Sequence, residues 1–139
     1  MAMRLALMRR TDLALRVLRL LERSPGSWQA SELANAVDST TQFIPQVLKP
    51  MVRAGWISSV SGPRGGYRLA MDLDSRTLLE LIELIEGPVE DGKCVLESTE
   101  CDATHPCALH GAWTWARDGL IERLGQTVIS GRTHGKANP

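Results

Sequence analysis

Apolar residues recur at helical spacing through the first half of the chain. The first run follows Thr11, a predicted N-cap, and ends near Arg23, ahead of Ser24-Pro25-Gly26. A shorter helix is predicted around Ala30 to Val37, and a turn at Asp38-Ser39 separates it from the next helix. The residues predicted to face inward are Leu13, Ala14, Val17, Leu18, Leu20 and Leu21, then Leu33, Ala34 and Val37, then Phe43, Ile44, Val47, Leu48 and Met51. A turn this tight between two helices predicts a helix-turn-helix.

A glycine-rich hairpin is predicted directly after the second helix of that motif. Ala54-Gly55 is typical of a helix end, and Trp56 to Val60 has strand-like residues. Residues 61–66 are rich in glycine and form a predicted turn, after which Tyr67 to Ala70 returns as the partner strand. A helix-turn-helix followed by such a hairpin predicts a winged helix, whose second helix enters the DNA major groove while the wing touches the backbone nearby.

The second half of the chain predicts two more helices with a polar segment between them. Thr77 and Glu80 match a capping box that opens a helix with Leu78, Leu81, Ile82 and Ile85 inward, and Gly87-Pro88 ends it. From about Cys107 a last helix carries two apolar stripes: Leu109, Trp113, Ala116, Leu120, Leu124 and Val128, and Ala108, Ala112 and Trp115. Apolar residues on more than one face need more than one partner surface, so we expect a two-fold homodimer through this helix.

The predicted fold class is mainly α with a small β-hairpin: a winged helix-turn-helix plus a long C-terminal dimerisation helix. The expected divisions are 1–73 for the winged helix, 74–106 for the connecting helix and cysteine loop, 107–130 for the dimerisation helix and 131–139 for a disordered tail.

Composition restricts the partners and the compartment. The chain has 139 residues, is 43% hydrophobic and has zero formal net charge, which suits one compact domain without a global basic field. DNA contact must therefore come from a local patch. No run of about twenty apolar residues is present, so we expect a cytoplasmic protein without a membrane partner.

The residues predicted to face DNA lie off the apolar stripe of the second helix and on the wing. Pro45 is tolerated only if that helix begins near Phe43 or Ile44, and Pro50 is expected to bend its far end. Glutamine can bond to adenine, lysine and arginine to guanine or phosphate, and Arg64 at the wing tip suits a narrow minor groove. The predicted DNA-binding residues are Thr40, Thr41, Gln42, Gln46, Lys49, Arg64 and Arg68.

Candidate metal chemistry is confined to one polar segment. Cys94, Cys101 and Cys107 are the only cysteines, spaced C-x6-C-x5-C, and an odd, clustered set of thiols predicts a metal site rather than a disulfide framework. Structural zinc modules usually have closer pairs, so the wider gaps favour an iron-sulfur cluster. Three thiolates also leave one coordination position for another ligand.

Other interpretations of the cysteines remain open at this point. They can be ordinary reduced thiols, although acidic neighbours such as Asp91 and Glu97 exclude an apolar core. They can bind structural zinc, which gives a colourless protein. An enzyme with Cys107 as nucleophile beside His105 or His110 is disfavoured, because no further orienting group accompanies them.

Four segments together resemble the winged-helix iron-sulfur transcriptional regulators, the family that includes NsrR, IscR and RirA. They are Thr11-Asp12-Leu13-Ala14-Leu15-Arg16, Val52-Arg53-Ala54-Gly55-Trp56-Ile57, the wing Gly62-Pro63-Arg64-Gly65-Gly66-Tyr67-Arg68-Leu69, and the three-cysteine segment. The likeness covers the chain from about Leu5 to Val128 and is nearest to NsrR-like members.

The resemblance implies a homodimeric transcriptional regulator, a repressor rather than an enzyme, that binds a double-stranded operator. Its cluster, [4Fe-4S] favoured over [2Fe-2S], would be held by the three cysteines and would sense nitric oxide. The first-helix motif matches members in which an aspartate reaches the partner's cluster, so Asp12 is the favoured fourth ligand. His110 or His105 is the alternative, as in members that use a histidine. Iron availability or redox state is the alternative signal.

Overall fold

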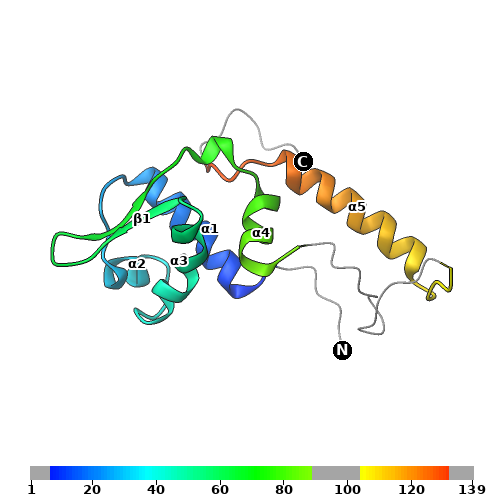
Figure 1. The fold of residues 1–139 in the computed structure, drawn as a ribbon, viewed down its shortest axis with the longest axis horizontal. Helices are drawn as coiled ribbons and strands as arrows, with labels where there is room; N and C mark the ends of the chain where they lie inside the picture. The colour runs from blue at the N-terminus through cyan, green and yellow to red at the C-terminus, as the bar shows by residue number, and fades with distance from the viewer. Residues whose placement is uncertain (1–6, 89–103, 132–139) are drawn as a thin grey trace.

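The described residues form a small helical body with one hairpin and one projecting helix (Figure 1). The computed structural model describes residues 7–88 and 104–131. The elements are α1 (Arg9–Arg23), α2 (Ala30–Ala36), α3 (Phe43–Arg53), β1 (Ile57–Val60), β2 (Gly66–Leu69), the 3-10 helix η1 (Leu73–Ser75), α4 (Leu78–Glu86) and α5 (His110–Gln126). Strands β1 and β2 are antiparallel, with Ile57 opposite Leu69 and Val60 opposite Gly66. This confirms the predicted fold class.

The core lies where α1, α3 and α4 meet the first residue of the hairpin. Leu18, Ile44, Leu48 and Leu81 are fully buried there, and burial of such side chains stabilises each by about 1.5–3 kcal/mol relative to exposure. Within β1 only Ile57 is buried, and the other three residues of that strand are exposed. The residues predicted to face inward in the first three helices are therefore buried, except Leu20 and Phe43, which are half-buried and pack against the core.

The start of α1 differs from the prediction. The helix begins at Arg9 after Met8, so Thr11 is not the N-cap but lies inside the first turn and is fully buried. Its hydroxyl donates a hydrogen bond to the Glu86 carboxylate at the end of α4. The prediction was wrong because a threonine ahead of an apolar run is ambiguous: its hydroxyl can cap its own helix or pair with a distant group.

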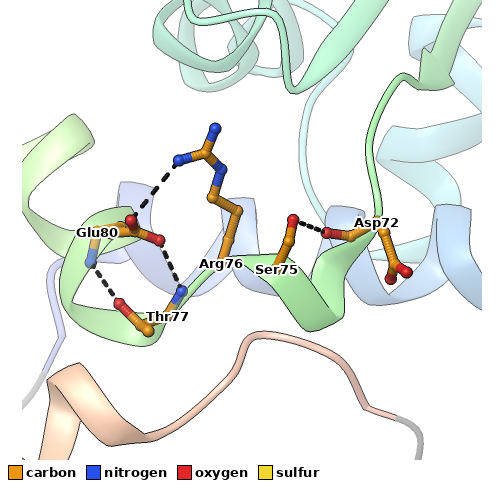
Figure 2. Close-up of polar contacts among 5 residues, drawn as sticks. All are labelled: Asp72, Ser75, Arg76, Thr77 and Glu80. Atoms are coloured by element: carbon orange, nitrogen blue, oxygen red, sulfur yellow. Dashed lines mark hydrogen bonds and ion pairs between the residues drawn. The ribbon is translucent and has the colours of Figure 1, made fainter.

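Hydrogen bonds fix the junction between η1 and α4 (Figure 2). Thr77 and Glu80 form the predicted capping box: the Glu80 backbone N–H donates to Thr77 Oγ1 at 3.2 Å, and the Thr77 N–H donates to Glu80 Oε2 at 2.9 Å. Ser75 Oγ donates to the Asp72 carbonyl at 2.6 Å, and Arg76 pairs with Glu80 at 3.6 Å. Helix α4 ends at Glu86, and Gly87 follows as its C-cap with a φ of 88°, which suits glycine.

Helix α5 extends away from the body and buries none of its residues within one chain. The helix ends at Gln126, whereas the predicted apolar stripe ran to Val128. The difference arises because Thr127 adopts an extended backbone conformation. The chain then returns to the body: the Leu78 N–H donates to the Thr127 carbonyl at 2.8 Å, and the Ile129 N–H donates to the Arg76 carbonyl at 2.9 Å.

The residues after α5 belong to the core of the winged helix. Ile129 is 0% exposed. The buried Glu22 carboxylate accepts hydrogen bonds from Ser130 Oγ at 2.8 Å and from the Gly131 N–H at 3.0 Å, and Arg19 Nε donates to the Ile129 carbonyl at 3.1 Å. We call residues 127–131 the C-terminal segment. The predicted disordered tail lies outside the described residues from 132 onward.

Candidate DNA-binding face and metal ligands

The polar side of α3 carries the predicted base-reading residues. Ile44, Val47, Leu48 and Met51 are buried, so the opposite side, with Gln42, Gln46 and Lys49, is exposed. Proline is accommodated as predicted, since the helix begins at Phe43 and Pro45 falls in its first turn, where no intrahelical N–H bond is required. Pro50 lies inside the helix, on its half-buried margin.

The turn before α3 leaves polar side chains available to a ligand. Thr40 and Thr41 are exposed, and Thr40 also accepts a hydrogen bond from the Phe43 N–H at 3.3 Å, which orders the start of the helix. Gln42 stands at the N-cap but makes no side-chain capping bond. Asp38 holds the turn with a φ of 55°, a conformation that aspartate tolerates better than most residues.

The wing supplies the remaining predicted contacts. Arg64 at its tip and Arg68 on β2 are both exposed. In Figure 1 the wing lies at the same end of the molecule as α2 and α3, opposite the far end of α5. The elements that carry the predicted DNA-binding residues thus lie towards one end of the molecule.

A basic groove continues the polar side of α3. It lies where α1, α3 and α4 meet, and Arg10, Lys49 and Arg53 line it together with Gln46 and Leu84. A chain with zero net charge therefore carries the local positive patch that phosphate contact requires.

Only part of the predicted metal-ligand set can be located. Cys94 and Cys101 lie outside the described residues, while Cys107 is half-buried ahead of α5, where its carbonyl accepts a hydrogen bond from the His110 N–H at 3.1 Å. His105 is exposed and its Nδ1 lies 3.0 Å from Thr104 Oγ1. Residues 7–88 and 104–131 hold no group of three or more potential ligands, so a complete site is not formed by the described residues of one chain.

Asp12 lies on the open side of the first turn of α1. Its carboxylate is 3.0 Å from Arg16 and its side chain is 44% exposed, so it is accessible to a second molecule. The start of α5, next to Cys107, lies far from α1 in Figure 1. The first turn of α1 and the start of α5 are therefore not brought together within one chain.

Sequence reasoning did not identify the residues that hold the wing. Ser27 and Gln29, ahead of α2, donate hydrogen bonds to the wing carbonyl of Gly65 at 2.7 and 3.0 Å. Polar residues in a loop carry no periodic signal, so only the three-dimensional contact reveals them.

Comparison with known proteins agrees with this architecture. The Rrf2 family model, described as an iron-dependent transcriptional regulator, matches residues 7–131. A protein of Aquifex aeolicus named as an HTH-type transcriptional regulator is 31% identical over 103 residues, covering 73% of this chain and 72% of the relative. The regulator IscR of Escherichia coli is 25% identical over 126 residues, covering 82% of this chain and 77% of the relative.

Solved structures show the same fold. The structure of CymR, the global cysteine regulator of Bacillus subtilis, superposes with a TM-score of 0.72 at 22% identity, covering 91% of this chain and 94% of that one. No helix among the described residues is long and apolar enough to cross a membrane. A family match over residues 7–131, on a chain with the winged-helix fold, identifies the protein as a member of the Rrf2 family of transcriptional regulators.

Proposed function

We propose that the protein is a homodimeric DNA-binding repressor whose iron-sulfur cluster senses nitric oxide. Cys94, Cys101 and Cys107 of one subunit and Asp12 of the other would hold the cluster. The observation that carries this proposal is the exposed Asp12 carboxylate in the first turn of α1, a helix that lies well away from the start of α5 in the same chain (Figure 1). We therefore assign the fourth ligand to Asp12 of a second copy rather than to Asp12 of the same chain.

The donor set fits such a cofactor. Thiolates are the usual ligands of iron-sulfur clusters, and a single non-thiolate ligand is accommodated in several of them. When bound, the cluster would supply iron with which nitric oxide reacts. The resemblance to NsrR-like regulators favours [4Fe-4S], and iron charge would offset the acidic residues around the cysteines.

Contacts on α1 connect the proposed ligand to the DNA-binding face. Thr11, next to Asp12, is bonded to Glu86 of α4, the helix that leads to the cysteine segment. Arg9 lies over the ring of Phe43, the first residue of α3, at 5.9 Å. Binding of Asp12 to the cluster, or its release, would therefore act on α1, which contacts α3 through Arg9 and Phe43. Regulation requires only that the attached and released dimers differ in DNA affinity.

On the DNA face, α3 would occupy the major groove. Thr40, Thr41, Gln42 and Gln46 would face bases and Lys49 would face guanine or phosphate. Arg64 and Arg68 would contact the backbone or the adjacent minor groove. The groove residues Arg10 and Arg53 would neutralise phosphates beyond the end of α3.

The test begins with anaerobic purification, a visible spectrum and iron and sulfide analysis, before and after nitric oxide. We expect a coloured protein with matched iron and sulfide and a spectrum that nitric oxide changes. Asp12→Ala should speed cluster loss and alter operator affinity. Glu32→Ala, which removes an exposed acid from the first turn of α2, should match wild type. If Asp12→Ala left both properties unchanged, the inter-subunit ligand would be wrong.

A second candidate is a regulator in which the same thiols act without a nitric-oxide-sensing cluster. The similarity to CymR, which is the global cysteine regulator of Bacillus subtilis and which has been solved in an oxidized form from Staphylococcus aureus, favours this alternative. The description of the family as iron-dependent favours iron availability as the signal. A protein that stays colourless after anaerobic reconstitution would leave zinc or thiol chemistry as the function of the cysteines.

A further inference from the structure

The wing is attached to the residues that precede α2. Backbone hydrogen bonds join Trp28 and Tyr67 in both directions, at 2.9 and 2.7 Å. Ser27 Oγ donates to the Gly65 carbonyl at 2.7 Å. The Gln29 amide nitrogen lies 3.0 Å from the same carbonyl, and 3.4 and 3.5 Å from those of Pro63 and Gly62.

Gln29 is placed to hold Arg64. Its amide reaches carbonyls on both sides of Arg64 in the chain, those of Gly62 and Pro63 before it and that of Gly65 after it. The Gln29 side chain is half-buried, whereas Arg64 is exposed. One side chain therefore spans the turn that presents the arginine.

The side chain of Gln29 is not needed by its own helix. Gln29 stands at the N-cap of α2, where a side chain commonly accepts a backbone hydrogen bond, but no such bond is present. Its amide turns to the wing instead. The amide therefore connects the helix-turn-helix to the wing.

The wing requires external support. Each of its strands has four residues, and most of β1 is exposed. An isolated two-stranded hairpin is marginally stable in water, so its position relative to α3 depends on contacts with the body. Towards the turn, those contacts are the ones made by Ser27, Trp28 and Gln29.

We propose that Gln29 is a positioning residue for DNA binding, which sets where Arg64 lies relative to the recognition helix without touching DNA itself. This rests on the proposed contact between Arg64 and DNA, but not on the cluster. Loss of the Gln29 amide would let the wing turn move and would remove the favourable contact of the arginine with the duplex.

The test is a double-mutant cycle between Gln29→Met and Arg64→Ala, measured as affinity at several salt concentrations. The probe is a duplex selected from a randomised double-stranded pool by the wild-type protein. Methionine keeps the side-chain length and removes the donor. We expect Gln29→Met to weaken binding about three- to tenfold in the wild type and less than about twofold in Arg64→Ala. We also expect it to reduce the salt slope by about as much as Arg64→Ala does.

The salt slope separates positioning from direct contact. Glutamine is uncharged, so its removal reduces the number of neutralised phosphates only by acting through a cation. Gln46→Met is the matched control: the same change on the exposed side of α3 should weaken binding independently of Arg64 and leave the slope unchanged. Gln29→Leu, which also lacks the donor and carries no charge, replaces Gln29→Met if that variant does not fold.

Three results would overturn the proposal: additive losses, unchanged affinity in Gln29→Met, or no effect of Arg64→Ala. Failure of the wild type to select any duplex is a different result, because it would overturn DNA binding as a whole. If the protein held no cluster but Gln29 and Arg64 were still coupled in DNA affinity, the result would count against the proposed sensor and not against the role of Gln29.

Discussion

At the scale of single residues, the wing depends on a glycine that no other residue replaces without strain. Gly66 has a φ of 123°, and a Cβ there would lie 2.5 Å from the Trp28 carbonyl oxygen. Gly55 has a φ of 80° but open space where its Cβ would be. An alanine at either glycine would strain the backbone, but only an alanine at Gly66 would also clash with a neighbouring residue.

Gly66→Ala should therefore destabilise the protein more than Gly55→Ala. Left-handed backbone at a non-glycine residue costs about 1–2 kcal/mol in both variants. Overpacking against Trp28 adds about 1–3 kcal/mol in Gly66→Ala alone. Urea denaturation of both variants measures the difference, and equal losses would show that the wing shifts at no cost to make room.

At the scale of elements, the sequence predicts those whose signal is local. The apolar stripes of α1 and α3, the capping box of α4 and the glycine-rich wing all lie within short windows, and the structure contains each of them. Residues whose partners are distant in sequence escaped prediction: Thr11 bonds to Glu86, and Gln29 bonds to Gly65. A hydroxyl or amide gives no indication of which distant group it will meet.

The candidate site divides in the same way. The polar side of α3 can be predicted from the helical period, because the residues that lie between the buried apolar positions must face outward. The fourth ligand of the proposed cluster does not follow from spacing, because α1, which carries Asp12, is distant from the cysteines in sequence and lies apart from the start of α5 in the structure. Only a motif held in common with known regulators points to that pair.

The C-terminal segment provides the test at this scale. Ile129 is 0% exposed although it follows α5, so Ile129→Ala should lower the free energy of unfolding by about 2–5 kcal/mol. Val60→Ala is the control, because that side chain is 64% exposed and should lose well under about 1 kcal/mol. Thermal and urea unfolding measure both. Equal, small losses would mean that the segment only rests on the surface.

At the scale of the whole molecule, α5 is a helix without a buried face in one chain. Trp115 is 82% exposed and Leu120 is 48% exposed. Large apolar side chains exposed along a helix that extends from the body favour a second copy as the partner, as the proposed function requires.

Trp115→Ser should therefore weaken self-association while leaving the winged helix folded. Burial of an aromatic side chain contributes about 1.5–3 kcal/mol, and a two-fold interface contains it twice, so the dimer dissociation constant should rise at least tenfold, or about 1.4 kcal/mol. Glu122→Ser, an exposed polar position on the same helix, is the control. Sedimentation velocity measures both, and an unchanged constant would place the interface elsewhere.

The return of the chain to the body after α5 also determines when the protein can fold. The core of the winged helix is made from residues up to Glu86 and is completed by Ile129, with α5 and the cysteines between them in sequence. During synthesis, which proceeds from the N-terminus, the DNA-binding unit therefore remains incomplete until the residues after α5 have left the ribosome. The cysteines emerge before the core closes, so assembly of a metal site and completion of the fold overlap in time.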